Sequence, residues 1–181
     1  ESLRWVAFNS EKIGIDPSKI AVGGDSAGGN LAAVTALYAK NIKGLNLCFQ
    51  LLIYPVVDMT FSFPSHKEFG RNFGILDTQT DNWFREHYIS DNFLRYDWRA
   101  SPLFATSFTN LPPTLIILAE LDMLIDEGKA FHQKIVGSGN KSELVIYKGM
   151  THGFFNASGV LDCARAAQVR CARTLRRAFS N

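Results

Sequence analysis

The sequence is poor in three features that mark particular classes of protein. Its apolar runs are short: segments such as Leu115–Ala119 fall far below the roughly 20 residues that a membrane-spanning helix needs. It has almost no excess charge, since 19 Lys and Arg residues against 17 Asp and Glu residues leave a net charge of +2. It holds only three cysteines, and no C-x-x-C pair. These deficits exclude a membrane-spanning helix within this sequence and argue against a disulfide scaffold.

Basic residues are concentrated at one place only, on a predicted C-terminal helix. A polyanion-binding patch is one interpretation, but a solvated helix face usually has this composition. With a nearly neutral chain we expect no nucleic-acid partner. The cluster consists of Arg165, Arg170, Arg173, Arg176 and Arg177.

The three cysteines favour reduced thiols. Cys163 and Cys171 lie on the same predicted helix, about 12 Å apart along its axis and therefore too far apart for a disulfide. Cys48 is then left over as well. Reduced cysteines are typical of a reducing compartment, and we expect a cytoplasmic location.

Continuous apolar runs alternate with helical patterns through most of the 181 residues. The length suits a single domain. Strands that are apolar throughout and separated by helices are typical of a parallel sheet covered on both faces, which predicts an α/β fold. The predicted strands are 20–23, 48–54, 114–119 and 144–147, and the predicted helices begin with a stripe at the first residue and continue with 28–40, 126–136 and 160–179.

The segment 59–100 interrupts this alternation. Ten of the 22 aromatic residues of the chain lie within it, without any strand pattern. The segment is long for a plain connection, so we predict a helical insertion over the sheet. A satellite core and a substrate-facing lid are both compatible with this composition. The ten aromatics are Phe61, Phe63, Phe69, Phe73, Trp83, Phe84, Tyr88, Phe93, Tyr96 and Trp98.

Residues 24–28, Gly-Asp-Ser-Ala-Gly, fit the pattern G-x-S-x-G. The pattern alone is weak, but a predicted strand precedes it and a predicted helix follows it, as a nucleophile elbow requires. Such a turn holds Ser26 in a strained conformation at the strand tip. We expect a Cβ at Gly24 or Gly28 to collide with neighbouring backbone.

The helix after this turn would direct its first N–H groups at Ser26. The N–H of Ala27 is the predicted oxyanion donor, because a helix N-terminus favours negative charge. Asp25 and Gly29 complete the predicted elbow. The alternative is an ordinary glycine-rich helix start.

A serine hydroxyl needs a base to remove its proton, and the base needs an orienting acid. In this kind of fold the chain order is Ser, acid, His. His66 and His87 lie in the aromatic segment, and His132 falls within a helical pattern. His152 lies in a glycine-flanked loop after the fourth predicted strand, and is the candidate base. A surface histidine without a catalytic role is the alternative.

Several acids follow the third predicted strand. Asp122 lies three residues beyond Ala119, the last predicted strand residue, where it could accept a hydrogen bond from the base. Asp126 and Glu127 are interpreted as first-turn residues of the next helix, where the helix dipole favours them. Asp58, after the second strand, is the other candidate for the acid.

Four blocks, in this order, resemble the hormone-sensitive-lipase-like (family IV) esterases. The resemblance extends over nearly the whole chain, although Met123 and Ile125 stand where that family often has Pro and Arg, and Thr151 replaces a usual aliphatic residue. The blocks are 20–32 (IAVGGDSAGGNLA), 51–58 (LLIYPVVD), 121–128 (LDMLIDEG) and 149–154 (GMTHGF).

The resemblance implies an α/β-hydrolase fold, of which residues 1–181 contribute four parallel strands, flanking helices and a helical cap at 59–100. It implies a catalytic triad of Ser26, Asp122 and His152, no metal and no cofactor. The implied reaction is hydrolysis of small carboxylic esters with short to medium acyl chains. It also suggests a homodimer through the last strand and the terminal helix.

One element of that family is absent from the sequence, namely the upstream His-Gly-Gly-Gly loop that supplies two oxyanion donors. We therefore expect the chain to be the C-terminal portion of a hydrolase and to be poorly active alone. Two alternative functions stay open: a ligand-binding module without catalysis on the same fold, and a serine amidase or peptidase.

Overall fold

The computed structural model describes residues 1–71 and 74–180. Its centre is a four-stranded sheet in the order β1-β2-β3-β4, and every neighbouring pair is parallel. The predicted α/β class is therefore confirmed. The strands are β1 (Ile20–Asp25), β2 (Leu47–Ile53), β3 (Thr114–Leu121) and β4 (Ser142–Thr151).

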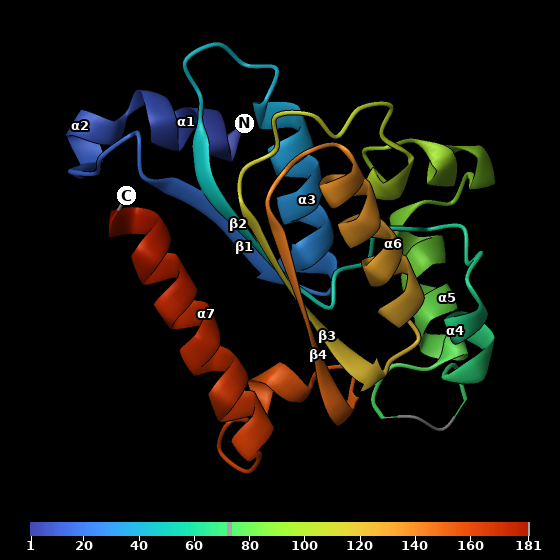
Figure 1. The fold of residues 1–181 in the computed structure, drawn as a ribbon. Coiled ribbons are helices and arrows are strands. Elements are labelled where there is room, and N and C mark those ends of the chain that lie inside the picture. The colour runs from blue at the N-terminus through green and yellow to red at the C-terminus, as the bar shows by residue number, and fades with distance from the viewer. Residues whose placement is uncertain (72–73, 181) are drawn as a thin grey trace.

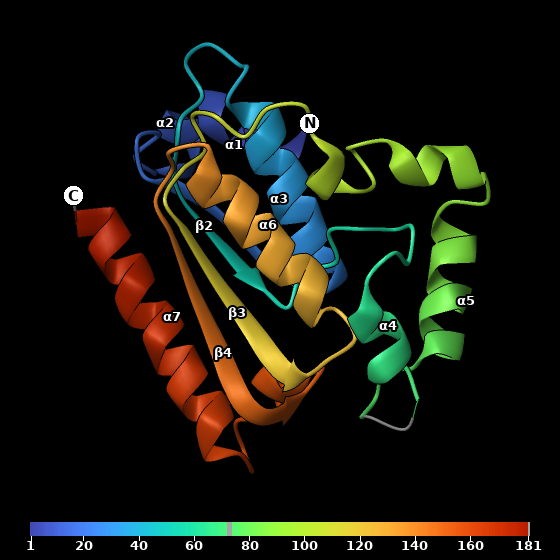
Figure 2. The same cartoon turned by 45° about the vertical axis from the view of Figure 1, so that its right-hand side comes forward.

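Helices cover both faces of the sheet (Figure 1). The helices α3 (Ala27–Ala39) and α6 (Ile125–Gly137) lie on one face, and α7 (Asp162–Ser180) lies on the other, as the rotated view also shows (Figure 2). Two short helices, α1 (Ser2–Phe8) and α2 (Ser10–Ile13), precede β1.

The two cores explain why β3 is apolar throughout. Successive side chains of a strand point to opposite faces. Ile116 and Leu118 pack with α3 and α6, whereas Leu115 and Ile117 pack with Ala164 and other residues of α7. All four of these strand side chains are fully buried. A strand sandwiched in this way needs apolar residues at every position, and this is why the sequence shows a continuous apolar run.

The described residues of segment 59–100 form helices and no strand. They include α4 (Pro64–Glu68), α5 (Thr78–Tyr88) and the 3-10 helix η1 (Asn92–Tyr96), and η2 (Pro102–Phe104) follows. In Figures 1 and 2, α4 and α5 lie beyond α3 and α6, away from α7. The side-chain amide of Asn30 in α3 holds both ends of this segment near the sheet. It donates to the carbonyls of Val56 and Ala100, each at 2.8 Å.

The aromatic residues of the segment have different environments. Phe61 and Phe69 pack against a small satellite core, whereas Phe93 is 87% exposed. Phe73 lies outside the described residues.

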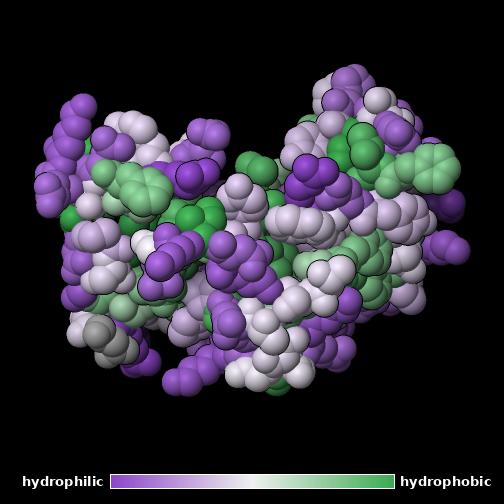
Figure 3. All heavy atoms as spheres, turned by 90° about the horizontal axis from the view of Figure 1, so that it is seen from above, coloured by the Kyte–Doolittle hydropathy of each residue, from purple (hydrophilic) through white to green (hydrophobic). Residues whose placement is uncertain are grey.

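The surface seen from the top of Figure 1 is a mosaic of hydrophilic and hydrophobic residues (Figure 3). Within residues 1–71 and 74–180, no helix is long and apolar enough to cross a membrane.

On α7, Arg165 pairs with Asp162 and Arg170 pairs with Glu143 on β4. These two arginines of the C-terminal cluster thus lie on a solvated, ion-paired helix face.

The carboxyl ends of the strands lie at one edge of the sheet and supply the positions from which a site can be built. Asp25, at the end of β1, pairs with Ile53 of β2. Leu121 of β3 pairs with Thr151 of β4 after a register shift that follows Ala119. Both of these strands end later than predicted, because their last pair follows that irregularity. β4 also begins two residues before its predicted start, at Ser142. Asp122 and His152 are therefore the first residues after the ends of two adjacent strands.

Candidate active site

Ser26 lies in the tight turn between β1 and α3. Its φ and ψ are 53° and −117°, a strained combination for a residue with a side chain. Three backbone hydrogen bonds hold it: its N–H donates to Ile53 O at 2.9 Å, and its carbonyl accepts from Asn30 N at 3.1 Å and Val56 N at 3.3 Å. The predicted strand–turn–helix context of Ser26 is confirmed, with Ala27 as the first residue of α3.

Close packing at the turn leaves no room for a side chain at Gly24 or Gly29, but it does leave room at Gly28. A Cβ on Gly24 would lie 2.4 Å from the backbone C and O of Gly28, and a Cβ on Gly29 would lie 2.8 Å from Pro55 Cβ. The predicted collision at Gly28 is wrong: the nearest atom to a Cβ there is Asp25 Oδ1, at 4.0 Å. The strand crosses the first helical turn at Gly28, so Gly24 must lack a Cβ while Gly28 contributes only its backbone.

This asymmetry predicts opposite effects for two matched substitutions. Gly24→Ala should prevent the turn from closing, at a cost of several kcal/mol in unfolding free energy, because two backbones cannot separate cheaply. Gly28→Ala should be neutral or stabilise the protein by up to about 1 kcal/mol, since alanine is the better helix former. Denaturant unfolding of both variants measures the difference. Equal destabilisation by the two substitutions would contradict this packing.

The structure brings together the three residues that the sequence proposed as a triad. His152 Nε2 lies 3.0 Å from Ser26 Oγ, and His152 Nδ1 lies 2.7 Å from Asp122 Oδ2. The His152 and Asp122 side chains are 8% and 1% exposed. Leu124, two residues after the acid in the sequence, donates its N–H to Asp122 Oδ1 at 2.9 Å. This geometry allows a proton to pass from the hydroxyl to the imidazole while the carboxylate fixes the ring.

The other candidate acid has different partners. The Asp58 carboxylate accepts hydrogen bonds from the Thr60 N–H and hydroxyl and, at 2.5 Å, from the Ser62 hydroxyl. It thus caps the turn that enters the 59–100 segment.

The remaining histidines also have partners elsewhere. His87 Nδ1 lies 2.8 Å from Trp83 O, and His132 Nδ1 lies 2.8 Å from Ser142 Oγ. His66 is fully buried against Glu127, with 2.7 Å between His66 Nε2 and the carboxylate. None of these three contacts involves Ser26.

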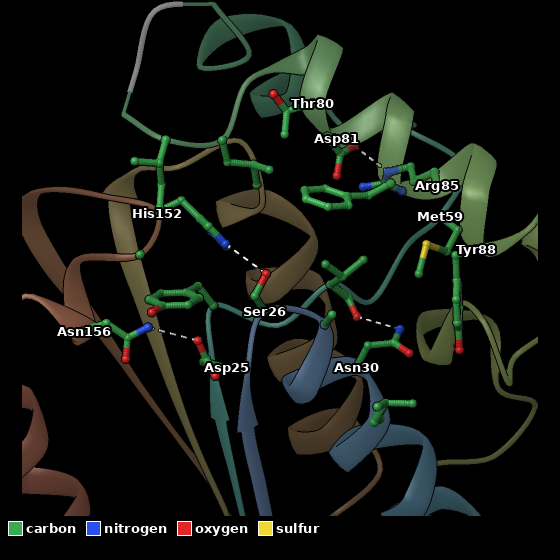
Figure 4. Close-up of a pocket in the computed structure, with 18 residues that line it drawn as sticks. Asp25, Ser26, Asn30, Met59, Thr80, Asp81, Arg85, Tyr88, His152 and Asn156 are labelled. Atoms are coloured by element: carbon green, nitrogen blue, oxygen red, sulfur yellow. Dashed lines mark hydrogen bonds and ion pairs between the residues drawn. The ribbon is translucent and has the colours of Figure 1, made fainter.

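A cavity of about 580 Å³ opens beside Ser26 and His152. Figure 4 shows the two side chains on one side of it, with Asp81, Arg85 and Tyr88 on the opposite side. Arg85 Nε pairs with Asp81 Oδ2 at 2.5 Å, so the two charges compensate each other within α5.

Tyr54 packs against the imidazole of His152. The ring of Tyr54, which is fully buried, has its centroid 4.5 Å from that of His152. Burial, together with the nearby Asp25 and Asp122 carboxylates, raises the pKa of the Tyr54 hydroxyl above its ordinary value. Tyr54 is therefore a neutral packing partner of the imidazole. The Asp25 carboxylate accepts from Asn156 Nδ2 at 3.3 Å.

The structure also contains a buried contact that the sequence analysis missed. Glu127 does lie in the first turn of α6, as predicted, but it is fully buried. Its Oε1 accepts from Val57 N at 2.7 Å and Asp58 N at 3.2 Å, while His66 binds Oε2. Burial raises the pKa of Glu127, and the hydrogen bond from His66 acts against that rise. A fully buried pair from segments 61 residues apart leaves no local pattern that could predict it.

Among residues 1–71 and 74–180, no group of three or more His, Cys, Asp or Glu side chains is placed to hold a metal ion. In the same part of the chain, Cys48, Cys163 and Cys171 are free thiols. Burial raises the pKa of the Cys171 thiol to about 11, so this thiol is protonated at neutral pH.

Known proteins resemble this chain in sequence. Residues 1–156 match the model of a family described as having the alpha/beta hydrolase fold. The chain is 33% identical to ethyl acetate hydrolase of Pseudomonas putida over 163 residues, 90% of this chain and 51% of that protein. It is 36% identical to carboxylesterase NlhH of Mycobacterium tuberculosis over 181 residues, 98% of this chain and 56% of that protein. The chain thus spans about half the length of these relatives.

Solved structures agree with this assignment. A thermostable carboxylesterase cloned from a metagenomic library is 39% identical, with a TM-score of 0.92 over 98% of this chain and 61% of that one. A hyperthermophilic esterase from Pyrobaculum calidifontis is also 39% identical, with a TM-score of 0.92 over 97% and 58% of the two chains. The chain belongs to the α/β-hydrolase superfamily, within its hormone-sensitive-lipase-like (family IV) esterases.

Proposed function

We propose that the protein is a serine carboxylesterase that acts through an acyl-enzyme. The supporting observation is the unbroken contact series from Ser26 Oγ through His152 to Asp122, with 3.0 Å and 2.7 Å between the partner atoms. His152 takes the Ser26 proton as the hydroxyl attacks the ester carbonyl carbon, and Asp122 stabilises the imidazolium. The imidazolium then protonates the departing alcohol. Water, deprotonated by His152, releases the acid from Ser26.

The negative charge of the tetrahedral intermediate needs hydrogen-bond donors close to Ser26. The N–H of Ala27 is at the first position of α3, where a helix leaves its N–H groups without an intrahelical partner. We assign Ala27 as one oxyanion donor. An additional donor would strengthen this stabilisation, because each one contributes about 2.7–4 kcal/mol in other hydrolases.

The segment 59–100 acts in this proposal as a cap that shapes the acyl or alcohol site. Phe84 and Tyr88 of α5, together with Met59, line the same cavity as Ser26. An apolar wall next to the nucleophile suits alkyl or aryl groups of short to medium length.

The direct test is turnover of p-nitrophenyl esters by the purified protein. We expect hydrolysis of acetate to hexanoate esters, and labelling of Ser26 by a fluorophosphonate. Amide substrates assayed in parallel distinguish an amidase, and binding of a small acid without labelling would indicate a ligand-binding module. Absence of both turnover and labelling would reject the esterase proposal. No contact in the described residues favours either alternative function.

The proposal also covers the oligomeric state and the cellular location of the protein. A homodimer through β4 and α7 is suggested by the family resemblance, and β4 has a neighbour on one side only among the described strands. A monomer at all concentrations in size-exclusion chromatography with light scattering would refute it.

The three free thiols favour a reducing location such as the cytoplasm, which fractionation of cells can check.

A further inference from the structure

The cap helix α4 is hydrogen-bonded to the loop that carries Asp122. Ser65, the second residue of α4, is only 1% exposed, and its hydroxyl donates to Met123 O at 2.7 Å. The backbone N–H of Ser65 donates to Asp126 Oδ2 at 3.2 Å, and Asp126 N approaches Ser65 Oγ at 3.4 Å. Ser65 therefore contacts this loop through its hydroxyl and the first turn of α6 through its backbone N–H.

The carbonyl held by Ser65 and the N–H that binds Asp122 belong to one peptide group. The C=O of Met123 and the N–H of Leu124 are the two ends of a planar unit, so they cannot reorient independently. Leu124 N–H donates to Asp122 Oδ1 at 2.9 Å. The Ser65 hydroxyl thus acts on the Asp122 carboxylate through a single rigid peptide.

The Asp122 carboxylate binds His152 through its other oxygen atom. Its Oδ2 accepts from His152 Nδ1 at 2.7 Å, and His152 Nε2 faces Ser26 Oγ at 3.0 Å. Hydrogen bonds in series polarise one another when they are shielded from water, and here Ser65, Asp122 and His152 are all less than 10% exposed.

A second buried contact keeps Ser65 in place. The next residue, His66, accepts a hydrogen bond at Nδ1 from Phe63 N at 3.3 Å, so its Nε2 carries the proton and donates to Glu127. Glu127 also binds the backbone N–H groups of Val57 and Asp58. The fully buried His66–Glu127 pair thus joins α4 to α6. This pair holds α4, and with it Ser65, against α6.

We propose that Ser65 is a positioning residue of the Ser26–His152–Asp122 triad, which acts from the cap through the peptide between Met123 and Leu124. The inference rests on the proposed esterase function for its kinetic consequence only. Ser65 is not among the described residues that line the cavity, so it should affect the chemical step and leave substrate binding unchanged.

The test compares Ser65→Ala and Ser65→Cys with a control in the same cap segment, Thr78→Ala. The Thr78 hydroxyl donates to Gly70 O at 2.9 Å and does not bind the Asp122 loop. Ser65→Ala should lower kcat by about fivefold or more with KM unchanged, which corresponds to the loss of one buried hydrogen bond. Ser65→Cys, a weaker donor, should give an intermediate kcat. Thr78→Ala should leave kcat unchanged.

A spectroscopic readout makes the inference independent of turnover. A buried His–Asp hydrogen bond gives a low-field proton resonance, which His152→Gln removes and His66→Gln does not. Ser65→Ala should shift and broaden this resonance, with thermal unfolding of each variant recorded to show that it is folded. An unchanged resonance and kcat in folded Ser65→Ala, or equal losses in Thr78→Ala, would overturn the inference. A perturbed resonance in a protein without ester turnover would reject the esterase proposal and retain the positioning contact.

Discussion

Replacing Ser26 with alanine is expected to lower kcat for p-nitrophenyl butyrate by about 10⁴- to 10⁶-fold, the range found when a serine nucleophile is removed from a triad. The reason is chemical, since no other hydroxyl lies against His152 Nε2 in the described residues. The cavity is unchanged by the loss of one oxygen atom, so binding of the ester should persist. Steady-state kinetics and fluorophosphonate labelling measure the two consequences.

The control for this substitution is Ser18→Ala. The Ser18 hydroxyl binds Asp16 at an exposed turn before β1, so this variant should keep full activity and full labelling. Hydrolysis by Ser26→Ala at the unmodified rate would eliminate the mechanism. It would leave the fold assignment unaffected, because that assignment rests on the match of residues 1–156 to the family model and not on Ser26 alone.

Replacing Asp122 with asparagine should lower kcat by about 10⁴-fold, as the equivalent exchange does in other triads. An asparagine at this position can present an N–H to His152 Nδ1, which would move the imidazole proton to Nε2. Nε2 would then be unable to accept the proton of Ser26. The shape of the site is retained, so KM should change little. The effect should therefore appear almost entirely in kcat.

Asp58→Asn is the matched comparison, because Asp58 was the other acid that the sequence allowed. Its carboxylate accepts from Thr60 and Ser62, and we expect a loss of stability with kcat reduced far less than in Asp122→Asn. Circular dichroism during thermal unfolding separates the two effects. If Asp58→Asn lost activity as severely as Asp122→Asn while still folded, the assignment of the acid would be wrong.

Much of the fold was predictable because its signals are local. A strand buried on both faces must be apolar throughout, and an amphipathic or small-residue helix pattern follows three of the four predicted strands. The Ser26 turn was predictable for the same reason, since a strand, a glycine-rich turn and a helix are contiguous in the chain. The ends of the strands were less accurate. β3 continues past Ala119 to Leu121 through an irregularity in its pairing with β4, which no local pattern records.

The sequence by itself therefore determined the class of fold, the strand–turn–helix at Ser26 and a short set of candidate acids and bases to accompany it. The tertiary structure decided which acid meets the imidazole, which glycine has no room for a Cβ and which residue of segment 59–100 contacts the loop of the acid. Asp122 and His152 meet because Leu121 and Thr151 are paired at adjacent strand ends. Gly24 has no room for a Cβ because the Gly28 backbone lies against it. Ser65 reaches Met123 across 58 residues of chain. Such contacts depend on strand register and helix docking, which arise from packing of the whole chain and leave no trace in residue spacing.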